Sequence, residues 1–209
     1  MKLKVIGDVH GRLDAWSKLT AGIVKPDVCI TLGDMGWAHP DMIDRRANGT
    51  LVVPGNHDHP PEIYPKCYLP DYGEVPGIPR SFYVRGAWSI DKAYRIPGRD
   101  WFPEEQLNDV ELAKAYESYI EAKPRVVFTH EAPCDVMNQM IIDGHVKLMM
   151  GDKRVSYNRT NMALQVMYDA HHPEIWVFGH YHTSVDVVIG DTRFRCLDEL
   201  EVWEFDYEV

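Results

Sequence analysis

The sequence has no apolar run that approaches the roughly 20 residues needed for a membrane-spanning helix. Its first strand-like stretch meets a charged motif at Asp8, too early for the apolar segment of a secretory signal. Only four cysteines occur, without any Cys-x-x-Cys pair, which argues against a disulfide framework and against a cysteine-based zinc site. We therefore expect a cytoplasmic protein with reduced thiols.

Positive charge is also scarce, with 22 Lys and Arg against 32 Asp and Glu and a formal net charge of −10. Duplex nucleic acid requires clustered cations, so this balance disfavours a duplex-binding surface. A small phosphate substrate stays compatible, because bound divalent metals reverse the local field. With 45% hydrophobic residues, the 209-residue chain is expected to form a single domain over residues 1–209.

What the sequence does contain is a series of short β-branched runs that stop abruptly at polar residues. Such runs predict strands buried on both faces. The five runs span Lys2–Ile6, Val28–Leu32, Thr50–Val53, Arg125–Thr129 and Ile175–Phe178. The polar residues always follow the carboxyl end of the run, where open α/β sheets bind their ligands.

Helices are expected between these runs, at Leu13–Ala21, Glu104–Ala122 and Asn161–Ala170. For the second of them, Pro103 near its start and acidic residues in its first turn support a helix whose buried face carries Leu107, Val110, Ala113 and Ile120. Near the end of the chain, Gly190-Asp191-Thr192 predicts a hairpin, and 202–207 a final strand. Residues 60–79 are expected to form a surface loop, and residues 134–157 a loop or mobile cover. The fold class is an α/β sandwich.

Asp, Asn and His residues follow all five predicted strands and should meet at one edge. One His after one strand indicates little, but repetition at five strand ends indicates a site. Carboxylate, amide and imidazole ligands without thiolate suit Mn²⁺, Fe, Zn²⁺ or Ni²⁺. Their number exceeds the needs of one tetrahedral ion and suits two metals about 3.5–4 Å apart. The candidate ligands are Asp8, His10, Asp34, Asn56, His130, His180 and His182.

In order and spacing these motifs resemble the signature of the calcineurin-like metallophosphoesterases. The motifs are Gly7-Asp8-Val9-His10-Gly11, Gly33-Asp34, Gly55-Asn56-His57-Asp58, Thr129-His130 and Gly179-His180-Tyr181-His182. A softer similarity, to small single-domain phosphoesterases of bacteria and bacteriophages, lies in residues 86–92 and 101–105.

The resemblance implies an αββα sandwich of two mixed β-sheets flanked by helices, and hydrolysis of a phosphate ester by in-line attack of a metal-activated water. Asp8, His10 and His182 would hold one divalent ion, and Asn56, His130 and His180 the other, with Asp34 between them. Manganese is the expected metal, with Fe, Zn or Ni as alternatives. His57 would donate a proton to the leaving oxygen or stabilise charge there; the alternative is a structural imidazole.

Several residues near the motifs keep two interpretations. Asp58 either orients His57 or caps the following turn. Arg12 either contacts a phosphate oxygen or forms a surface salt bridge. The remaining histidines match no part of the signature and are expected at the surface or at helix ends: His39, His59, His145, His171 and His172. Loop aromatic residues either stack a base or pack against the sandwich: Trp37, Tyr64, Tyr72, Trp88 and Trp101.

The second motif departs from that of the related protein Ser/Thr phosphatases, which read Gly-Asp-x-x-Asp-Arg-Gly. Trp37 stands where their second acid stands, and the following arginine is absent. Since a monoester dianion benefits from an arginine clamp, we expect a phosphodiesterase that acts on small diesters such as cyclic nucleotides. The alternatives are a phosphomonoesterase for nucleotides or phosphoproteins, and a catalytically silent scaffold. The oligomeric state stays open.

Overall fold

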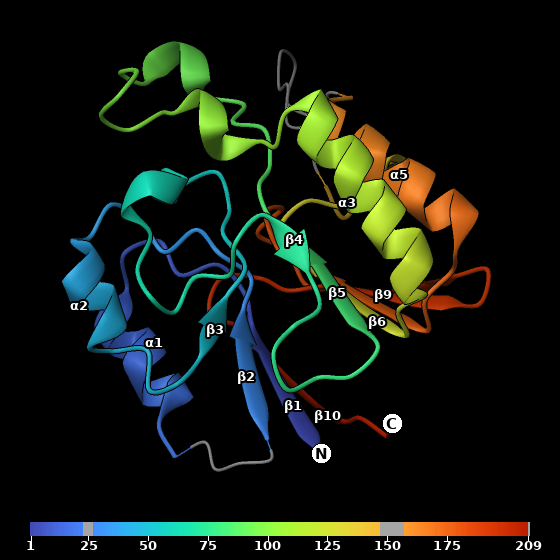
Figure 1. Ribbon diagram of the computed structural model, residues 1–209, viewed down its shortest axis with the longest axis horizontal. Coiled ribbons are helices and arrows are strands. Elements are labelled where there is room, and N and C mark those ends of the chain that lie inside the picture. The colour runs from blue at the N-terminus through green and yellow to red at the C-terminus, as the bar shows by residue number, and fades with distance from the viewer. Residues whose placement is uncertain (23–26, 147–156, 209) are drawn as a thin grey trace.

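The computed structural model describes residues 1–22, 27–146 and 157–208, and its strands form two sheets (Figure 1). The four-stranded sheet has the order β10-β1-β2-β3. Its parallel members are β1 (Lys2–Ile6), β2 (Val28–Thr31) and β3 (Leu51–Val52), and β10 (Val202–Asp206) pairs antiparallel with β1.

The six-stranded sheet has the order β4-β5-β6-β7-β9-β8. Its parallel centre consists of β5 (Ser81–Val84), β6 (Val126–Thr129), β7 (Ile175–Phe178) and β9 (Thr192–Cys196). Antiparallel strands close both sides, β4 (Tyr72–Gly73) beside β5 and β8 (Val185–Ile189) beside β9. The five predicted strands and the predicted hairpin are confirmed.

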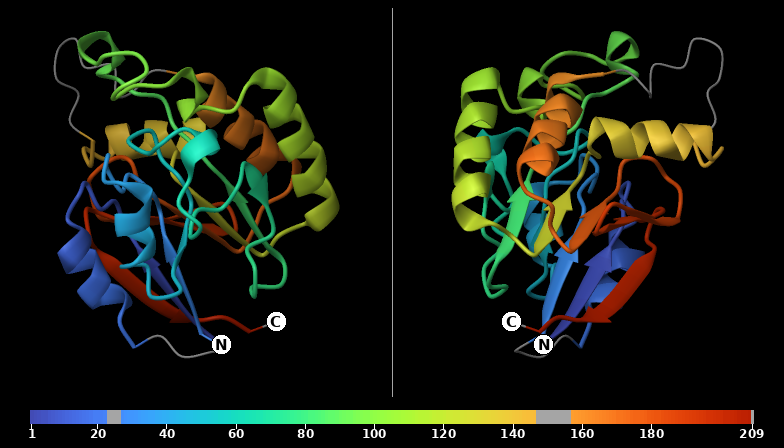
Figure 2. Two further views of the ribbon diagram at one scale, coloured as in Figure 1. Left: turned by 60° about the vertical axis from the view of Figure 1, so that its left-hand side comes forward. Right: turned by 90° about the vertical axis from the view of Figure 1, so that its right-hand side faces the viewer.

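Helices cover the outer face of each sheet (Figure 2). α1 (Leu13–Thr20) and α2 (Pro40–Asp44) pack on the four-stranded sheet, where Trp16 and Ile43 share a core with Ile6 and Cys29. α3 (Asp109–Ala122), α4 (Cys134–Ile142) and α5 (Arg159–Ala170) pack on the six-stranded sheet. The predicted αββα sandwich is confirmed. Among the described residues, no helix combines the length and apolar character needed to span a membrane.

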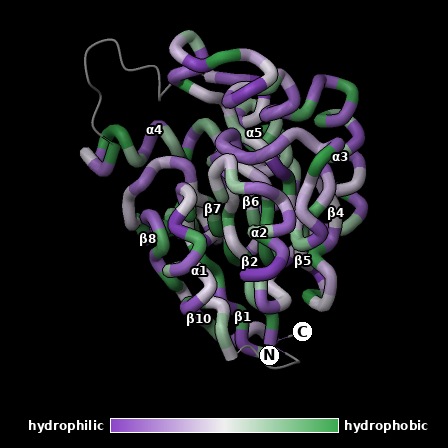
Figure 3. Tube along the Cα trace, turned by 90° about the vertical axis from the view of Figure 1, so that its left-hand side faces the viewer, coloured by the Kyte–Doolittle hydropathy of each residue, from purple (hydrophilic) through white to green (hydrophobic). Residues whose placement is uncertain are grey.

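A third core fills the space between the sheets, which explains why the strand sequences are apolar without interruption. In β6, Val126 and Phe128 face the other sheet, while Val127 between them packs against the helices. Because both sides of such a strand are buried, the alternation of polar and apolar residues disappears. Hydrophobic stretches accordingly run through the central strands (Figure 3).

The predicted helix at 104–122 begins five residues later than expected. Pro103 starts a short 3₁₀ turn, and the α-helix starts after Asn108, whose side chain accepts hydrogen bonds from the backbone of Val110 and Glu111. The predicted buried face is confirmed for Leu107, which is buried, and for Ile120, which packs against the core, but it is wrong for Val110 and Ala113. Val110 is 64% exposed, and the face that packs on the sheet carries Leu112, Ala115 and Tyr119.

The two predicted loops contain more structure than expected. The prediction of a loop over 134–157 is wrong for α4, and its residues 147–156 lie outside the described part of the chain. The 60–79 stretch is not a simple surface loop, because it supplies β4 and buries Leu69, Val75 and Ile78 between the sheets. Strand β5, which follows it, was missed although all four of its residues are buried.

Candidate metal centre

Loops at the carboxyl ends of strands from both sheets carry all seven predicted ligands. Asp8 and His10 follow β1, Asp34 follows β2 and Asn56 follows β3, whereas His130 follows β6 and the last two histidines follow β7. They meet at a cleft of about 570 Å³, lined in part by His10, Asp34, Asn56, His180 and His182. The two sheets therefore contribute to one site.

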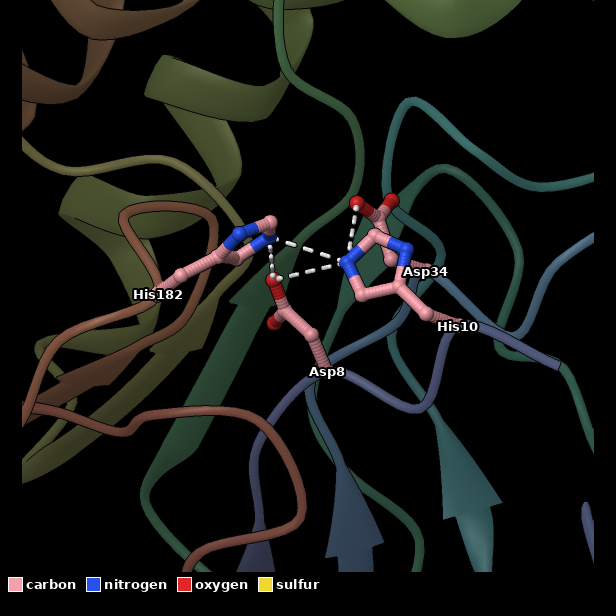
Figure 4. Close-up of side chains that lie close together, drawn as sticks. All are labelled: Asp8, His10, Asp34 and His182. Atoms are coloured by element: carbon pink, nitrogen blue, oxygen red, sulfur yellow. Dashed lines mark hydrogen bonds and ion pairs between the residues drawn. The ribbon is translucent and has the colours of Figure 1, made fainter. Parts of the chain in front are cut away.

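The first group of possible metal ligands comprises Asp8, His10, Asp34 and His182 (Figure 4). The Nε2 atoms of His10 and His182 lie 2.9 Å apart. Asp8 Oδ2 lies 3.3 Å from His182 Nε2 and 3.8 Å from His10 Nε2, and Asp34 Oδ2 lies 3.7 Å from His10 Nε2. Two imidazole nitrogens and two carboxylates thus converge on one point, as the ligands of one ion do.

The second group comprises Asp34, His130 and His180, so Asp34 belongs to both. Its Oδ1 lies 3.2 Å from His130 Nε2, while its Oδ2 faces the first group. The other ring nitrogen of His130 donates to the backbone oxygen of Leu32 at 2.5 Å. That bond places a proton on Nδ1, so Nε2 is the atom through which His130 would bind a metal.

Two of the candidate ligands each have a buried atom without a hydrogen-bond partner, namely His130 Nε2 and Asn56 Oδ1. The Asn56 amide is oriented by its nitrogen, which donates to Ser89 Oγ at 3.0 Å. Ser89 Oγ in turn donates to Glu105 Oε2 at 2.5 Å. A buried polar atom without a partner is costly, and a divalent cation held by both residues would give each atom a partner. The residues present therefore fit a dinuclear metal centre.

The charges of the centre are strongly coupled. Burial raises the pKa of Asp34, but the neighbouring His130 outweighs it and holds that pKa well below its ordinary value. Burial lowers the pKa of His130, yet the carboxylates of Asp34 and Asp8 prevail and raise it to about 10. Burial also lowers the pKa of His180, whereas the hydrogen bond to Asp8 raises that of His182. In the metal-free site, the carboxylates thus stabilise the protonated form of His130 and His182. Bound metal ions would supply positive charge in place of these protons.

Four of the seven candidate ligands have a left-handed backbone, with φ of +46° at His10, +49° at Asp34, +70° at His180 and +48° at His182. Such conformations cost energy in residues other than glycine and concentrate at functional sites. Glycines next to the ligands have a different role, because the absence of a side chain lets ligand side chains approach the glycine backbone closely. A Cβ atom on Gly179 would lie 2.2 Å from Asp8 Oδ1.

Asp58 connects the second and third motifs. Its carboxylate accepts hydrogen bonds from the backbone nitrogens of Asp34 (2.8 Å), Met35 (2.9 Å) and Gly55 (2.7 Å), and from the Tyr68 hydroxyl (2.6 Å). The bond to Gly55 closes the turn that precedes Asp58, not the following turn that the sequence analysis considered. The bonds to Asp34 and Met35 fix the backbone around Asp34, the candidate ligand that belongs to both groups.

His57 contacts Arg95, a residue that the sequence analysis did not single out. Arg95 Nη2 lies 3.1 Å from His57 Nδ1 and also contacts Nε2, and it forms an ion pair with Asp91 at 2.7 Å. Burial is the main cause that lowers the pKa of His57 to about 4; the Asp34 carboxylate opposes this shift and Arg95 adds to it. The softer sequence similarity at 86–92 and 101–105 lies on either side of Arg95 without including it, so no sequence signal identified this residue.

Supporting residues flank the other ligands as well. Arg12 forms a salt bridge to Glu199 at 2.6 Å, which was one of the two roles expected from the sequence. Glu199 also lies 3.6 Å from His182 Nδ1. Glu131 Oε2 lies 3.9 Å from His180 Nε2. Of the five other histidines, His145 lies at the surface just after the end of α4, as expected, and it also lines the cleft.

Most of the loop aromatic residues have protein partners. Trp37 packs edge-on against His59 and also against Phe102. Lys92 Nζ lies over both Trp88 and Trp101, at 5.3 and 5.9 Å from the ring centroids. These contacts favour loop packing over base stacking for the three tryptophans.

Comparison with known proteins agrees with this geometry. Residues 1–184 match the sequence profile of the family described as calcineurin-like phosphoesterase. None of the curated proteins compared matches the chain.

Solved structures share the fold at low sequence identity. A Mycobacterium tuberculosis protein named phosphopantetheinyl hydrolase is 14% identical, with a TM-score of 0.51 over 95% of this chain and 89% of that one. A Staphylococcus aureus protein described as a 5′-nucleotidase is 14% identical, with a TM-score of 0.54 over 97% of this chain and 50% of that one. A 5′-nucleotidase precursor from Thermus thermophilus is 13% identical, with a TM-score of 0.50 over 100% of this chain and 51% of that one. The chain thus spans about half the length of the two nucleotidases.

Proposed function

The chain belongs to the calcineurin-like phosphoesterase family, and from this premise we propose that it is a phosphodiesterase for small diesters such as cyclic nucleotides. The family uses a dinuclear divalent metal centre and hydrolyses phosphate esters. The observation that carries the proposal for this chain is the pair of ligand groups that share Asp34.

We propose that the seven candidate ligands divide between two ions as the family signature implies. Asp8, His10 and His182 would hold one ion, Asn56, His130 and His180 the other, and Asp34 would contact both. Ions bound there would polarise the phosphoryl oxygens and lower the pKa of a bound water. We propose Mn²⁺ as the native metal, since the oxygen and nitrogen ligands suit it.

His57 lies beside these ligands, and its backbone nitrogen donates to Asp34 Oδ1 at 2.8 Å. Because burial lowers the pKa of His57 to about 4, its imidazole is neutral near pH 7, with one ring nitrogen protonated and the other an acceptor. A neutral imidazole in this state can donate a hydrogen bond to the leaving oxygen. We propose that His57 stabilises charge there by this bond.

The lining of the cleft supports a diester substrate. Among the described residues that line it, none is a lysine or an arginine. A monoester dianion carries one charge more than a diester and gains more from a cationic clamp. In the described lining, strong positive charge would come only from bound metal ions. Such a cleft suits the singly charged diester.

Hydrolysis of bis-p-nitrophenyl phosphate and of p-nitrophenyl phosphate by metal-stripped protein reloaded with Mn²⁺ tests the proposal. We expect the diester to have the higher kcat/KM, and Asp34→Asn to abolish both activities. A monoester preference would contradict the diesterase proposal and favour the second candidate, a phosphomonoesterase. Absence of metal-dependent activity on both esters would favour a silent scaffold.

The specific observation in favour of the second candidate is Arg95, a cation in contact with His57. The groups that surround Arg95 therefore determine how much positive charge a substrate in the cleft experiences.

A further inference from the structure

Asp91 and Arg95 form an ion pair at the edge of the cleft, next to His57. Asp91 Oδ1 and Arg95 Nη2 lie 2.7 Å apart, and the same Nη2 contacts the His57 ring. The Arg95 side chain is only 7% exposed, whereas that of Asp91 is 44% exposed and lines the cleft. The carboxylate, rather than the guanidinium, is thus the partner that a substrate meets.

The remaining contacts of Arg95 point into the protein. Its Nη1 lies 3.4 Å from the backbone oxygens of Asn56 and of Asp100. With Asp91 and His57 on Nη2, the guanidinium is surrounded by groups of this chain. Asp91 therefore cancels the charge of a cation that would otherwise act on the leaving-group side of the cleft.

The segment that carries this pair is anchored at its base and in its middle. It is the green stretch at the top of Figure 1, above the carboxyl ends of the strands. Gly86 donates its backbone N–H to Pro54 at 2.8 Å, and the Ser89 backbone N–H donates to Glu105 at 3.0 Å. Lys92, between Asp91 and Arg95 in sequence, lies over Trp88 and Trp101. The pair is therefore held in position beside the ligand loop that carries Asn56 and His57.

We propose that the net charge of the Asp91–Arg95 pair determines which phosphate esters the site prefers. With both charges present the pair is neutral, and a dianionic monoester gains little from Arg95. The singly charged diester is affected less by the sign of the pair, because its interaction with any nearby charge is half as large. This inference rests on the proposed function and names Asp91 and Arg95 as specificity-determining residues.

A charge series tests the inference. Arg95→Gln makes the pair negative, Asp91→Asn makes it positive, and the double variant restores neutrality without either charge. Two substrates with the same leaving group, p-nitrophenyl phosphate and its methyl ester, differ by one charge at phosphorus. The quantity measured is the ratio of their kcat/KM values, monoester to diester, with Mn²⁺ at low salt. If a substitution displaces His57, both reactions should slow, and this effect should largely cancel in the ratio.

We expect the ratio to rise about tenfold in Asp91→Asn, to fall about tenfold in Arg95→Gln and to return near the wild-type value in the double variant. The differences should shrink in high salt. Glu104→Gln is the matched control, because it removes one charge from an exposed position of the same segment; its ratio should equal that of the wild type. A thermal melt of each variant shows that it is folded.

A ratio that is the same in all variants would overturn the inference and leave the proposed activity intact. The inference also fails if the double variant behaves like Asp91→Asn, since specificity would then not depend on net charge. Absence of hydrolysis of both esters by the wild-type protein would instead contradict the proposed function. A wild-type monoester preference that rises further in Asp91→Asn would refute the diesterase and support the role of the pair.

Discussion

Asn56 and His130 each present one unpartnered buried atom, and in both residues a hydrogen bond on the opposite atom fixes the orientation. Ser89 accepts from the Asn56 amide nitrogen, and the backbone oxygen of Leu32 accepts from His130 Nδ1. The Oδ1 atom of Asn56 and the Nε2 atom of His130 are thereby directed to the site before any metal is bound. Preorganisation of this kind reduces the reorganisation that metal binding requires.

The glycines beside the ligands provide the first prediction. Alanine at Gly179 would place Cβ 2.2 Å from Asp8 Oδ1, and alanine at Gly55 would place it 2.3 Å from Asp34 Oδ1. Each carboxylate must shift, so we expect kcat/KM to fall by about 100-fold or more together with metal affinity. Activity assays and metal titrations would measure this.

Gly49→Ala is the control, because Gly49 has φ of +82° and no atom within 4 Å of a built Cβ. It should lower the free energy of unfolding by about 1–2 kcal/mol and leave metal binding unchanged. Wild-type activity in Gly179→Ala would show that the close contact between the Gly179 backbone and the Asp8 carboxylate is not important for activity.

Asp58 provides a second prediction at this scale. Asp58→Ala removes the acceptor of three buried backbone N–H groups, so the free energy of unfolding of the metal-free protein should fall by about 3–5 kcal/mol. Tyr68→Phe removes only the fourth hydrogen bond and should cost about 1 kcal/mol. Urea unfolding measures both values, and a similar loss in the two variants would show that Asp58 does not hold the motifs together.

At the scale of elements, α3 and α5 pack against each other, and each begins with an asparagine in a capping box. Asn108 caps α3 at an exposed position. Asn158 caps α5 and also donates from Nδ2 to Glu131 Oε2 at 3.1 Å. Glu131 is buried, accepts from the Tyr181 hydroxyl, and lies behind the candidate ligand His180. The Asn158 side chain is therefore bonded to a residue of the site, whereas the Asn108 side chain accepts from the backbone of α3 itself.

The two caps make a matched pair of variants. Asn108→Ala and Asn158→Ala should each lower the free energy of unfolding by about 1 kcal/mol, the usual value of an N-cap. Only Asn158→Ala should also lower kcat/KM, by roughly threefold to tenfold, since Glu131 loses a partner that orients it. Equal activities in the two variants would mean that the Glu131 network has no part in the reaction.

At the scale of the whole molecule, the candidate centre joins the two sheets. Asp8, His10 and Asp34 belong to loops of the four-stranded sheet, and His130, His180 and His182 to loops of the six-stranded sheet. Metal ions bound between them would connect the two halves of the sandwich. Any ligand that binds only the folded state also stabilises it, by about 2.7 kcal/mol at a concentration of 100 Kd.

Metal removal and pH together test this linkage. In the metal-free fold the pKa of His130 is raised to about 10, so its ion-pair stabilisation is complete below the ordinary His pKa of 6.5 and is lost as pH rises towards 10. A metal must displace that proton, so metal affinity should increase from pH 6 to pH 8 with release of protons. Thermal melts with EDTA and with Mn²⁺ at both pH values measure the effect. We expect a larger metal-induced rise in Tm at pH 8, and little rise in Asp34→Asn; an equal rise at both pH values would contradict the linkage.

The sequence by itself determined the five principal strands, the sandwich class and the seven candidate ligands. These features depend on short-range patterns, namely a buried apolar run and the polar residues that follow it. Parallel strands of one sheet bring their carboxyl ends to one edge by general rule, which groups Asp8 with Asp34 and His130 with His180. That these two groups belong to one site was implied by the resemblance to the family signature.

The tertiary structure alone decided which residues support and surround these ligands. Ser89, Asp91 and Arg95 reach the site because the segment after β5 folds back over it, and His145 reaches the cleft from beyond α4. The buried face of α3 likewise depends on its packing against the sheet and α5, which placed Val110 in solvent. Such contacts depend on non-local packing of loops and faces, and no local period or spacing in the chain encodes them.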